Sequence, residues 1–501
     1  MIFLLKISQK VFILILVFIF LVFFLYKNPL ISQPQLTDPQ TCKDCNLIII
    51  SLTNVGAKHL SAYDYPYETS PKINELSKKS LVFENAFSHA SWTLPSGASF
   101  FTSLFPFSHG IMDRYSGKIL SHDATTLADA LNSQGYRTAA FTGGFDYNLR
   151  YNVINRFTET KIFDKGERFS FRKLAATVDI YGDLPLTLPA AIDWLEKNSD
   201  KKFFAFVQGY DAHCPFTPPE PYNNLFDPNY NGTLDFSSCF FTYEKTEPVI
   251  IDGKKTYFTN TAYYDEETEN FIVENVSLDE NDIKHLVALH DGEIRYADDL
   301  VGQLLDKVNE LGLSEKTIII VFSEHGDMLG KQGRFMRGGP IRGTFYDDVL
   351  HVPLIIKHPN LEPKRIKGLV QLIDVMPTLL DFLEIKIDAK IEGQNLLPLI
   401  LKNENINDFA FAGAEFTPPP DSIFFKNPTT VTSARNKDWK LIREIVYTPN
   451  NISIESINYE LYDLKNDPEE LSNVFGRHKE IELLFNQSLN ERFEDIPILN
   501  S

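Results

Sequence analysis

The sequence predicts an α/β fold in which a mostly parallel central sheet is flanked by helices, with a smaller α+β subdomain at the C-terminal end. Short apolar runs, such as 47–50, 203–207 and 317–322, alternate with amphipathic segments of helical length. Continuous apolar runs are typical of buried parallel strands, and their alternation with helices predicts a sheet covered on both faces. After about residue 408 the alternation stops and strand pairs begin.

Length and charge narrow the class of protein further. The 501 residues are 43% hydrophobic, which is enough for one large globular domain or two ordinary ones. The 67 acidic and 48 basic residues give a formal net charge of −19. This balance argues against nucleic acid as a partner, because phosphate backbones are bound by basic surfaces.

Residues 1–27 predict a membrane anchor. An unbroken apolar and aromatic run covers 11–26, with Lys6 and Lys10 before it and Lys27 after it. No small-residue cleavage site follows, which favours an uncleaved anchor over the alternative, a cleaved signal peptide. The positive-inside rule then predicts a single-pass protein with its large domain on the extracytoplasmic side of the membrane.

A polar, proline-containing tether is expected at 28–45. It contains Cys42 and Cys45, which could form a disulfide, provide half of a metal site, or do neither. An extracytoplasmic location would permit the disulfide. Cys214 is expected to be a small residue of the core.

The main domain is predicted to span 46–408. Its expected elements are a strand at 47–50, helices at 71–79, from Pro95 and at 126–134, a strand at 138–141, a helix at 188–198, a strand at 203–207, a polar insertion with little helix at 223–275, a helix at 279–311, strands at 317–322 and 352–357, and a helix at 374–383. The C-terminal subdomain, 409–501, is expected to contain a strand pair at 430–443, a strand at 459–464, a turn at 468–472 and a helix at 478–492.

Thr93 stands at the start of the helix expected near Pro95. Proline suits the first turn of a helix, where its missing N–H is not needed. The free N–H groups and dipole of a helix N-terminus favour an anion. Thr93 is therefore either a simple N-cap or a hydroxyl that attacks or holds an oxyanion such as sulfate or phosphate.

Three predicted strands run into polar clusters. These clusters are Thr53-Asn54, Asp211-Ala212-His213 and Glu324-His325. Ligands of parallel α/β sheets bind beyond the carboxyl ends of the strands, so we expect the three clusters to meet at one site.

Several of these segments resemble the sulfatase family of the alkaline phosphatase superfamily. The segment Thr93–Ser99 (TLPSGAS) is similar to the family's nucleophile motif, Cys/Ser/Thr-x-Pro-Ser-x-Ala-Ser. Asp211–Pro215 (DAHCP) resembles its Asp-x-His-x-Pro, and Phe322–Gly330 (FSEHGDMLG) resembles its T-S-D-H-G-E-x-L-G. The motifs follow the family's order between residues 46 and 473.

The resemblance implies a hydrolase or transferase of sulfate esters, or of phosphate esters, carried on a glycan or lipid. Together with the predicted anchor, this describes a membrane-anchored enzyme that faces outward. It makes Thr93 the nucleophile and gives His213 and Arg342 the task of binding the anionic group or protonating the leaving oxygen. It also implies a divalent metal cation, whose ligands would be Thr53, Asn54, Glu324, His325 and Thr93.

The chain departs from the family pattern at positions that bear on this chemistry. Threonine at 93 cannot mature to formylglycine, and Thr53 and Asn54 replace carboxylates. Glu324 is then the one carboxylate, which favours a zinc-like ion over calcium. Gly97 stands where the family often has Arg or His. A second interpretation therefore remains open, namely a sulfatase-like protein that binds an anionic glycan or lipid without turnover.

Three further side chains receive structural interpretations. His109 is expected to pack under the helix that follows Thr93. Asp298 and Asp299 are expected on the solvated face of the 279–311 helix or in an ion pair within it.

Overall fold

The computed structural model describes residues 41–112, 117–144, 146–163, 183–234, 236–242, 246–265, 270–337, 344–417, 427–449 and 453–493. The predicted anchor at 1–27, and residues 28–40 of the predicted tether, lie outside these ranges. Within them, none of the helices combines the length and the apolar character that crossing a bilayer requires.

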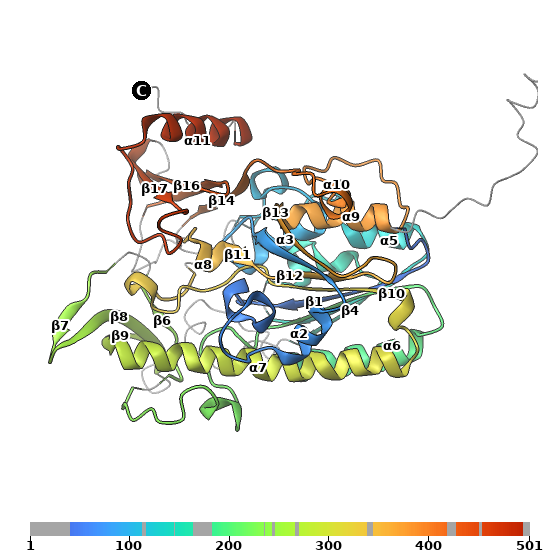
Figure 1. Ribbon diagram of the computed structural model, residues 1–501, viewed down its shortest axis with the longest axis horizontal. Helices are drawn as coiled ribbons and strands as arrows, with labels where there is room; N and C mark the ends of the chain where they lie inside the picture. Colours follow the sequence, from blue (N-terminus) through green and yellow to red (C-terminus); the bar gives the residue numbers. More distant parts are fainter. Residues whose placement is uncertain are drawn as a thin grey trace, which may run out of the picture. The chain divides into compact units, whose positions relative to one another are not determined.

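A nine-stranded mixed sheet forms the centre of the described chain (Figure 1). Five neighbouring strands are parallel, and the other side of the sheet contains the antiparallel pairings. The predicted fold class is therefore confirmed. In sheet order, the strands are β4 (Glu159–Phe163), β3 (Arg137–Gly143), β5 (Phe203–Gly209), β1 (Asn46–Leu52), β10 (Thr317–Phe322), β12 (Leu354–Lys357), β2 (Leu81–Phe87) and β11 (His351–Val352), with β13 (Lys364–Gln371) also paired to β2.

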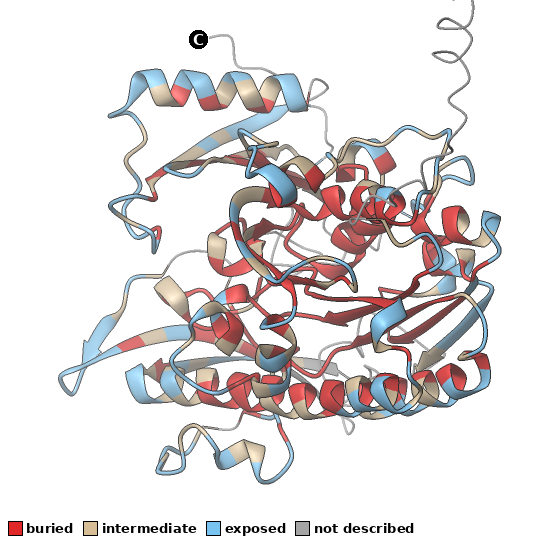
Figure 2. Ribbon diagram, turned by 45° about the vertical axis from the view of Figure 1, so that its right-hand side comes forward, coloured by how far each residue is buried: buried red, intermediate tan, exposed pale blue. Residues whose placement is uncertain are grey.

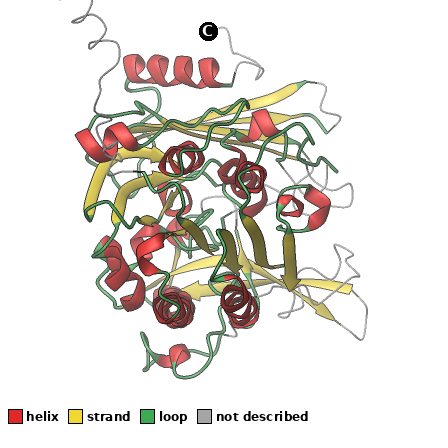
Figure 3. Ribbon diagram, turned by 90° about the vertical axis from the view of Figure 1, so that its right-hand side faces the viewer, coloured by secondary structure: helices red, strands yellow, loops and turns green. Residues whose placement is uncertain are grey.

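Helices cover both faces of this sheet, as Figure 3 shows. On β1, Leu47 and Ile49 face one apolar cluster while Ile48 and Ile50 face the other, because successive side chains of a strand point to opposite faces. One cluster includes α3 (Thr93–Thr102), α5 (Leu127–Ser133), α9 (Val375–Phe382) and α10 (Leu397–Lys402); the other includes α2 (Pro71–Ser77), α6 (Leu184–Asn198) and α7 (Glu280–Glu310). The sheet and its facing helix surfaces are accordingly buried (Figure 2).

The C-terminal part is an antiparallel sheet with one covering helix. The predicted strand pair and last helix are confirmed, and a further strand precedes them. Phe485 and Leu489 of the helix are buried against the sheet. The elements are β14 (Ala410–Phe416), β15 (Thr429–Arg435), β16 (Trp439–Tyr447), β17 (Ile454–Asp463) and α11 (Lys479–Arg492).

The segment expected to be a polar insertion contains little helix, as predicted, but it forms a second antiparallel sheet that was not foreseen. Its strands are β6 (Phe240–Phe241), β7 (Val249–Ile251), β8 (Lys254–Asp265) and β9 (Asn270–Asp279). Asp252 and Gly253, with φ of 52° and 80°, join β7 to β8. An Asp-Gly pair between two strand-like runs is a hairpin signal, and here it marks a turn of the sheet that the sequence analysis did not predict.

Several boundaries differ from the prediction for local reasons. The strand expected at 352–357 is divided into β11 and β12 at Pro353, which has no N–H to donate.

Short helical segments in the described chain are η1 (Ala57–His59), η2 (Ser61–Tyr63), α4 (Pro106–His109), η3 (Leu149–Tyr151), η4 (Ile154–Arg156), η6 (Tyr222–Asn224), η7 (Ser314–Lys316), η8 (Lys331–Gly333), α8 (Asp347–Leu350) and η9 (Leu372–Asp374).

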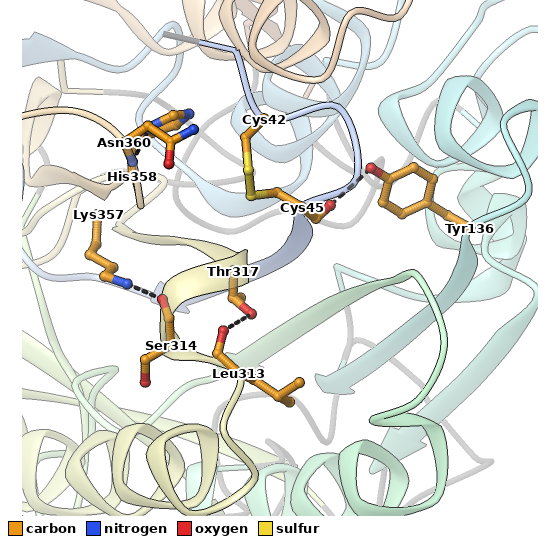
Figure 4. Close-up of a disulfide and its surroundings, with 9 residues drawn as sticks. All are labelled: Cys42, Cys45, Tyr136, Leu313, Ser314, Thr317, Lys357, His358 and Asn360. Atoms are coloured by element: carbon orange, nitrogen blue, oxygen red, sulfur yellow. Dashed lines mark hydrogen bonds between the residues drawn. A yellow bond between two sulfur atoms is a disulfide. The ribbon is translucent and has the colours of Figure 1, made fainter. Parts of the chain in front are cut away.

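All four cysteines are paired. Cys42 bonds to Cys45, and the Cys45 carbonyl accepts a hydrogen bond of 2.9 Å from Tyr136 (Figure 4). Cys214 is buried in an apolar cluster, as expected, and it also bonds to Cys239, which the sequence analysis did not foresee. The pairing brings the end of β5 to the loop before β6, a contact between distant segments that spacing alone does not reveal.

Asp298 and Asp299 have different roles on α7. Asp299 forms the expected ion pair with Arg295. Asp298 is fully buried, and its two oxygens each accept a 2.8 Å hydrogen bond from the backbone N–H groups of Lys72 and Ile73. These N–H groups belong to the first turn of α2 and have no partner within that helix. The solvated role expected for Asp298 was therefore wrong.

Candidate functional site

Four neighbouring strands, β3, β5, β1 and β10, direct their carboxyl ends toward the N-terminus of α3. Thr93 is the first residue of this helix and Trp92 occupies the cap position, so Thr93 is not the N-cap. Its side chain is fully buried, with Oγ1 3.1 Å from Nε2 of His325. The predicted strand-end cluster and the predicted hydroxyl are thus in direct contact.

The hydrogen bonds of His325 define the direction of its contact with Thr93. Nδ1 of His325 lies 2.9 Å from the carbonyl oxygen of Gly326. A carbonyl can only accept, so Nδ1 carries the hydrogen and Nε2 of the neutral ring accepts from the Thr93 hydroxyl. This is the arrangement in which an imidazole can act as a general base toward a hydroxyl nucleophile.

Glu324 is a fully buried carboxylate that already has three hydrogen-bond donors. Ser51 and Tyr147 donate to Oε1 over 2.6 and 2.7 Å, and Thr53 donates to Oε2 over 3.2 Å. Burial raises the pKa of Glu324, while these hydrogen bonds oppose part of that increase. Glu324 therefore links β1, β10 and the segment after β3.

Tyr147 is a site residue that the sequence analysis missed. It follows β3, and its ring packs on Phe101 and Phe206 with its hydroxyl at Glu324. A Cβ atom added at Gly97 would overlap the Tyr147 hydroxyl and approach its Cζ to 2.8 Å. The glycine in the nucleophile motif thus leaves space for the tyrosine, and no sequence-local signal connects these two positions.

The five residues predicted to bind a metal do not fit a hard divalent cation. Such a cation needs several negatively charged oxygen ligands. Thr53 uses its hydroxyl hydrogen for Glu324 and accepts a 2.8 Å bond from Gln208. Asn54 donates to the Ala212 carbonyl, and its buried Oδ1 has no hydrogen-bond partner in the described chain. With His325 engaged by Thr93 and Glu324 accepting three bonds, the set lacks the required charge.

His213 belongs to a second part of the site. Its Nδ1 lies 2.7 Å from the Cys214 carbonyl oxygen, which leaves Nε2 to accept a 2.6 Å hydrogen bond from Arg337. Arg337 is only 3% exposed, and its Nε and Nη1 have no hydrogen-bond partner among the described residues. A buried guanidinium with unused donors is well suited to an anion.

Arg342, the cation nominated from the sequence, lies outside the described residues. Arg337 was not nominated, because nothing in its local sequence distinguishes it from Arg334 three residues earlier. Only its contact with His213 does so.

Two other motif residues have supporting roles. His109 is buried, and its Nε2 lies 3.0 Å from Ser99 Oγ of α3, so it packs under α3 as predicted. Asp211 accepts a 3.0 Å bond from the Leu184 N–H at the start of α6. Burial and the nearby Asp183 raise the pKa of Asp211 to about 8. In the Asp-x-His segment, His213 therefore contacts Arg337, and Asp211 contacts the first residue of α6.

A hydroxyl at a helix N-terminus, an accepting imidazole and a buried guanidinium define a site of the kind that acts on anionic esters. The family described as Sulfatase matches residues 45–385, and the family described as N-sulphoglucosamine sulphohydrolase, C-terminal, matches 342–497. The chain therefore belongs to the sulfatase family.

Individual relatives are distant. Arylsulfatase K of Rattus norvegicus is 26% identical over 84% of this chain and 72% of its own, and that of Homo sapiens is 24% identical over 84% and 77%. Among solved structures, the phosphonate monoester hydrolase of Agrobacterium radiobacter has a TM-score of 0.66 and 20% identity, covering 90% of this chain and 95% of its own. That structural likeness supports the fold.

The fit between Gly97 and Tyr147 leads to a test of stability. The change Gly97→Ala is expected to destabilise the protein by about 1–3 kcal/mol, because the new methyl group overlaps the Tyr147 ring. In a Tyr147→Ala background the same change should cost much less, because the obstructing ring is absent. Urea denaturation of the four proteins measures this coupling. Equal costs of Gly97→Ala in both backgrounds would show that the two side chains do not compete for the space.

Proposed function

We propose that the chain is a hydrolase of sulfate esters in which Thr93 attacks sulfur and His325 accepts the hydroxyl proton. The contact between Thr93 Oγ1 and His325 Nε2 is the observation that supports this proposal. Thr93 Oγ1 forms the new bond to sulfur, and the ester S–O bond breaks as the alcohol leaves with a proton from solvent. Water then attacks sulfur from the side opposite Thr93, the S–Oγ1 bond breaks, and the protonated His325 returns its proton to Thr93 Oγ1, so that sulfate and a proton are released to solvent.

Arg337 and His213 supply the remaining requirement, a binding site for the anionic group. Arg337 is a buried cation whose Nε and Nη1 have no hydrogen-bond partner among the described residues, so it can donate to an anionic group. His213 holds the guanidinium through Nη2, and Ala212, next to it, accepts from Asn54 beside the nucleophile pocket. No step in this mechanism passes through a metal, because Thr53, Glu324 and His325 already use their side-chain atoms in hydrogen bonds within the site.

Sulfated glycans are the substrate class we propose. Similar folds include a protein solved with its substrate D-glucosamine-2-N,6-O-disulfate and another described as a 2-O GAG sulfatase, with TM-scores of 0.65 and 0.60. The phosphonate monoester hydrolase has the same fold, so a phosphoryl ester is the chemistry to compare with sulfate.

Turnover of an aryl sulfate tests the roles of Thr93 and His325. Thr93→Ala should abolish turnover because the attacking hydroxyl is lost. Thr93→Ser should retain turnover because the hydroxyl remains. His325→Gln should lower kcat by about 10²–10⁴-fold, since the general base is lost. Initial rates on an aryl sulfate and on an aryl phosphodiester, measured side by side, give both the mechanism and the preferred ester.

Circular dichroism and Tm measurements show whether each variant is folded. Unchanged turnover by Thr93→Ala would reject Thr93 as the nucleophile. The wild-type protein could fail to turn over the two aryl esters and also sulfated oligosaccharides. That result would favour the second candidate, a protein that binds an anionic glycan without hydrolysing it. The observation that favours this candidate is Glu324, whose carboxylate is occupied by Ser51, Tyr147 and Thr53.

Binding of a sulfated oligosaccharide tests Arg337 independently of turnover. Arg337→Gln should weaken binding by about 30-fold or more, because an anion in the buried pocket loses its paired charge. Isothermal titration of the Thr93→Ala protein, with and without Arg337→Gln, measures this without hydrolysis. Arg137→Gln is the matched control, since Arg137 is exposed and pairs with Glu159. Equal losses in the two arginine variants would indicate a general charge effect instead.

We also propose that residues 1–27 anchor the protein in a membrane with the large domain outside the cytoplasm. The apolar run and its flanking lysines support this, and the disulfides Cys42–Cys45 and Cys214–Cys239 fit an oxidising compartment.

The full chain is expected in the membrane fraction after washing at high pH, and a chain lacking residues 1–27 is expected in the supernatant. A mature protein whose first residue lies beyond position 27 would show that the segment is a cleaved signal instead.

A further inference from the structure

A second cluster of ligand-type side chains lies next to the nucleophile pocket but shares no residue with it. His59 ends η1, and His290 and Asp291 are consecutive on α7. One nitrogen or oxygen atom from each lies within 4.8 Å of the others. The three residues are 6%, 0% and 1% exposed, so the cluster is enclosed by protein.

The hydrogen bonds of His290 leave one ring nitrogen in an unfavourable position. Nε2 lies 3.2 Å from the carbonyl oxygen of Asn54, which can only accept, so Nε2 carries the hydrogen. In the neutral ring, Nδ1 is then a bare lone pair. It has no hydrogen-bond partner in the part of the chain that the structure describes, and it lies 3.8 Å from Oδ1 of Asp291. A lone pair facing a carboxylate oxygen in a buried site is repulsive unless a positive charge lies between them.

The remaining members present the complementary groups. Oδ1 of Asp291 accepts a 3.0 Å bond from Nδ1 of His59, and Oδ2 accepts a 2.7 Å bond from the Tyr65 hydroxyl. A neutral imidazole is the form that binds metals.

We propose that His59, His290 and Asp291 bind a divalent cation of the zinc type at a site separate from the catalytic pocket. Ligand atoms at 2.0–2.1 Å around a tetrahedral zinc are about 3.3 Å apart, and the two observed separations from Asp291 Oδ1, 3.0 and 3.8 Å, bracket this value. Two imidazoles and one carboxylate favour zinc over calcium or magnesium.

Binding requires little rearrangement. The cation takes the lone pairs of the two histidines and of Asp291 Oδ1, and His59 changes tautomer, so that its ring hydrogen moves from Nδ1 to Nε2. Tyr65 continues to donate to Oδ2 and orients the ligating carboxylate, as supporting residues around metal sites commonly do. The cation would hold η1 and the Asn54 backbone against α7.

The first measurement is the zinc content and affinity of the full-length wild-type protein. After chelator treatment and dialysis, isothermal titration with Zn²⁺ should show one tight site, and Co²⁺ should give the intense visible absorption of a site with low coordination number. X-ray absorption at the zinc edge should show imidazole scattering. These readouts use wild type alone, and absence of stoichiometric binding overturns the proposal.

Two variants locate the site. His290→Gln keeps a donor for the Asn54 carbonyl and His290→Phe keeps the aromatic packing against Phe216 and His59, yet both remove the Nδ1 ligand. Each should weaken zinc binding about tenfold or more.

Two controls separate this site from its neighbours. His285→Gln is the matched control on α7, since His285 contacts Asp227 and Tyr230 instead. Thr93→Ala should bind zinc normally, which separates this site from the proposed nucleophile. Zinc binding that persists in both His290 variants, or that is lost in His285→Gln, would place the cation elsewhere.

Discussion

The geometry of the site depends on one buried carboxylate. Glu324 lies at the end of β10 and is held by hydroxyl groups from β1, from the residue after β1 and from the segment after β3. A buried carboxylate without donors would be costly, so these strand ends must meet for Glu324 to be tolerated. His325 follows immediately, and its position against Thr93 is therefore determined by the anchoring of Glu324.

The same carboxylate explains why Gly97 and Tyr147 belong together. A tyrosine hydroxyl can reach Glu324 only if the helix beside it leaves room, and the glycine in the second turn of α3 provides that room. The consequence is electrostatic. The Tyr147 phenol at Glu324 carries no positive charge, so the positive charge for an anionic group must come from elsewhere. Arg337, buried and with two unused nitrogens, is the described group that can supply it.

The fold could be predicted from the sequence to the extent that apolar periodicity reports it. The runs that became β1, β5 and β10 are fully buried strands, and their polar ends indicated where the site lies. Tyr147, Arg337 and His290 could not be nominated in this way. Each acquires its role from a contact between distant segments, such as Tyr147 with Glu324, and local composition contains no record of such contacts.

Asn54 connects the nucleophile pocket to the proposed zinc site, and its backbone shows how. Its φ of 74° places it in the left-handed region, which asparagine adopts more readily than most other non-glycine residues. Its side chain donates to Ala212 of the segment that carries His213, while its carbonyl accepts from His290. A cation bound by His290 would strengthen the second of these restraints without touching Thr93. In this chain, therefore, the metal would stabilise the loop that shapes the pocket, and activation of the hydroxyl would remain the task of His325.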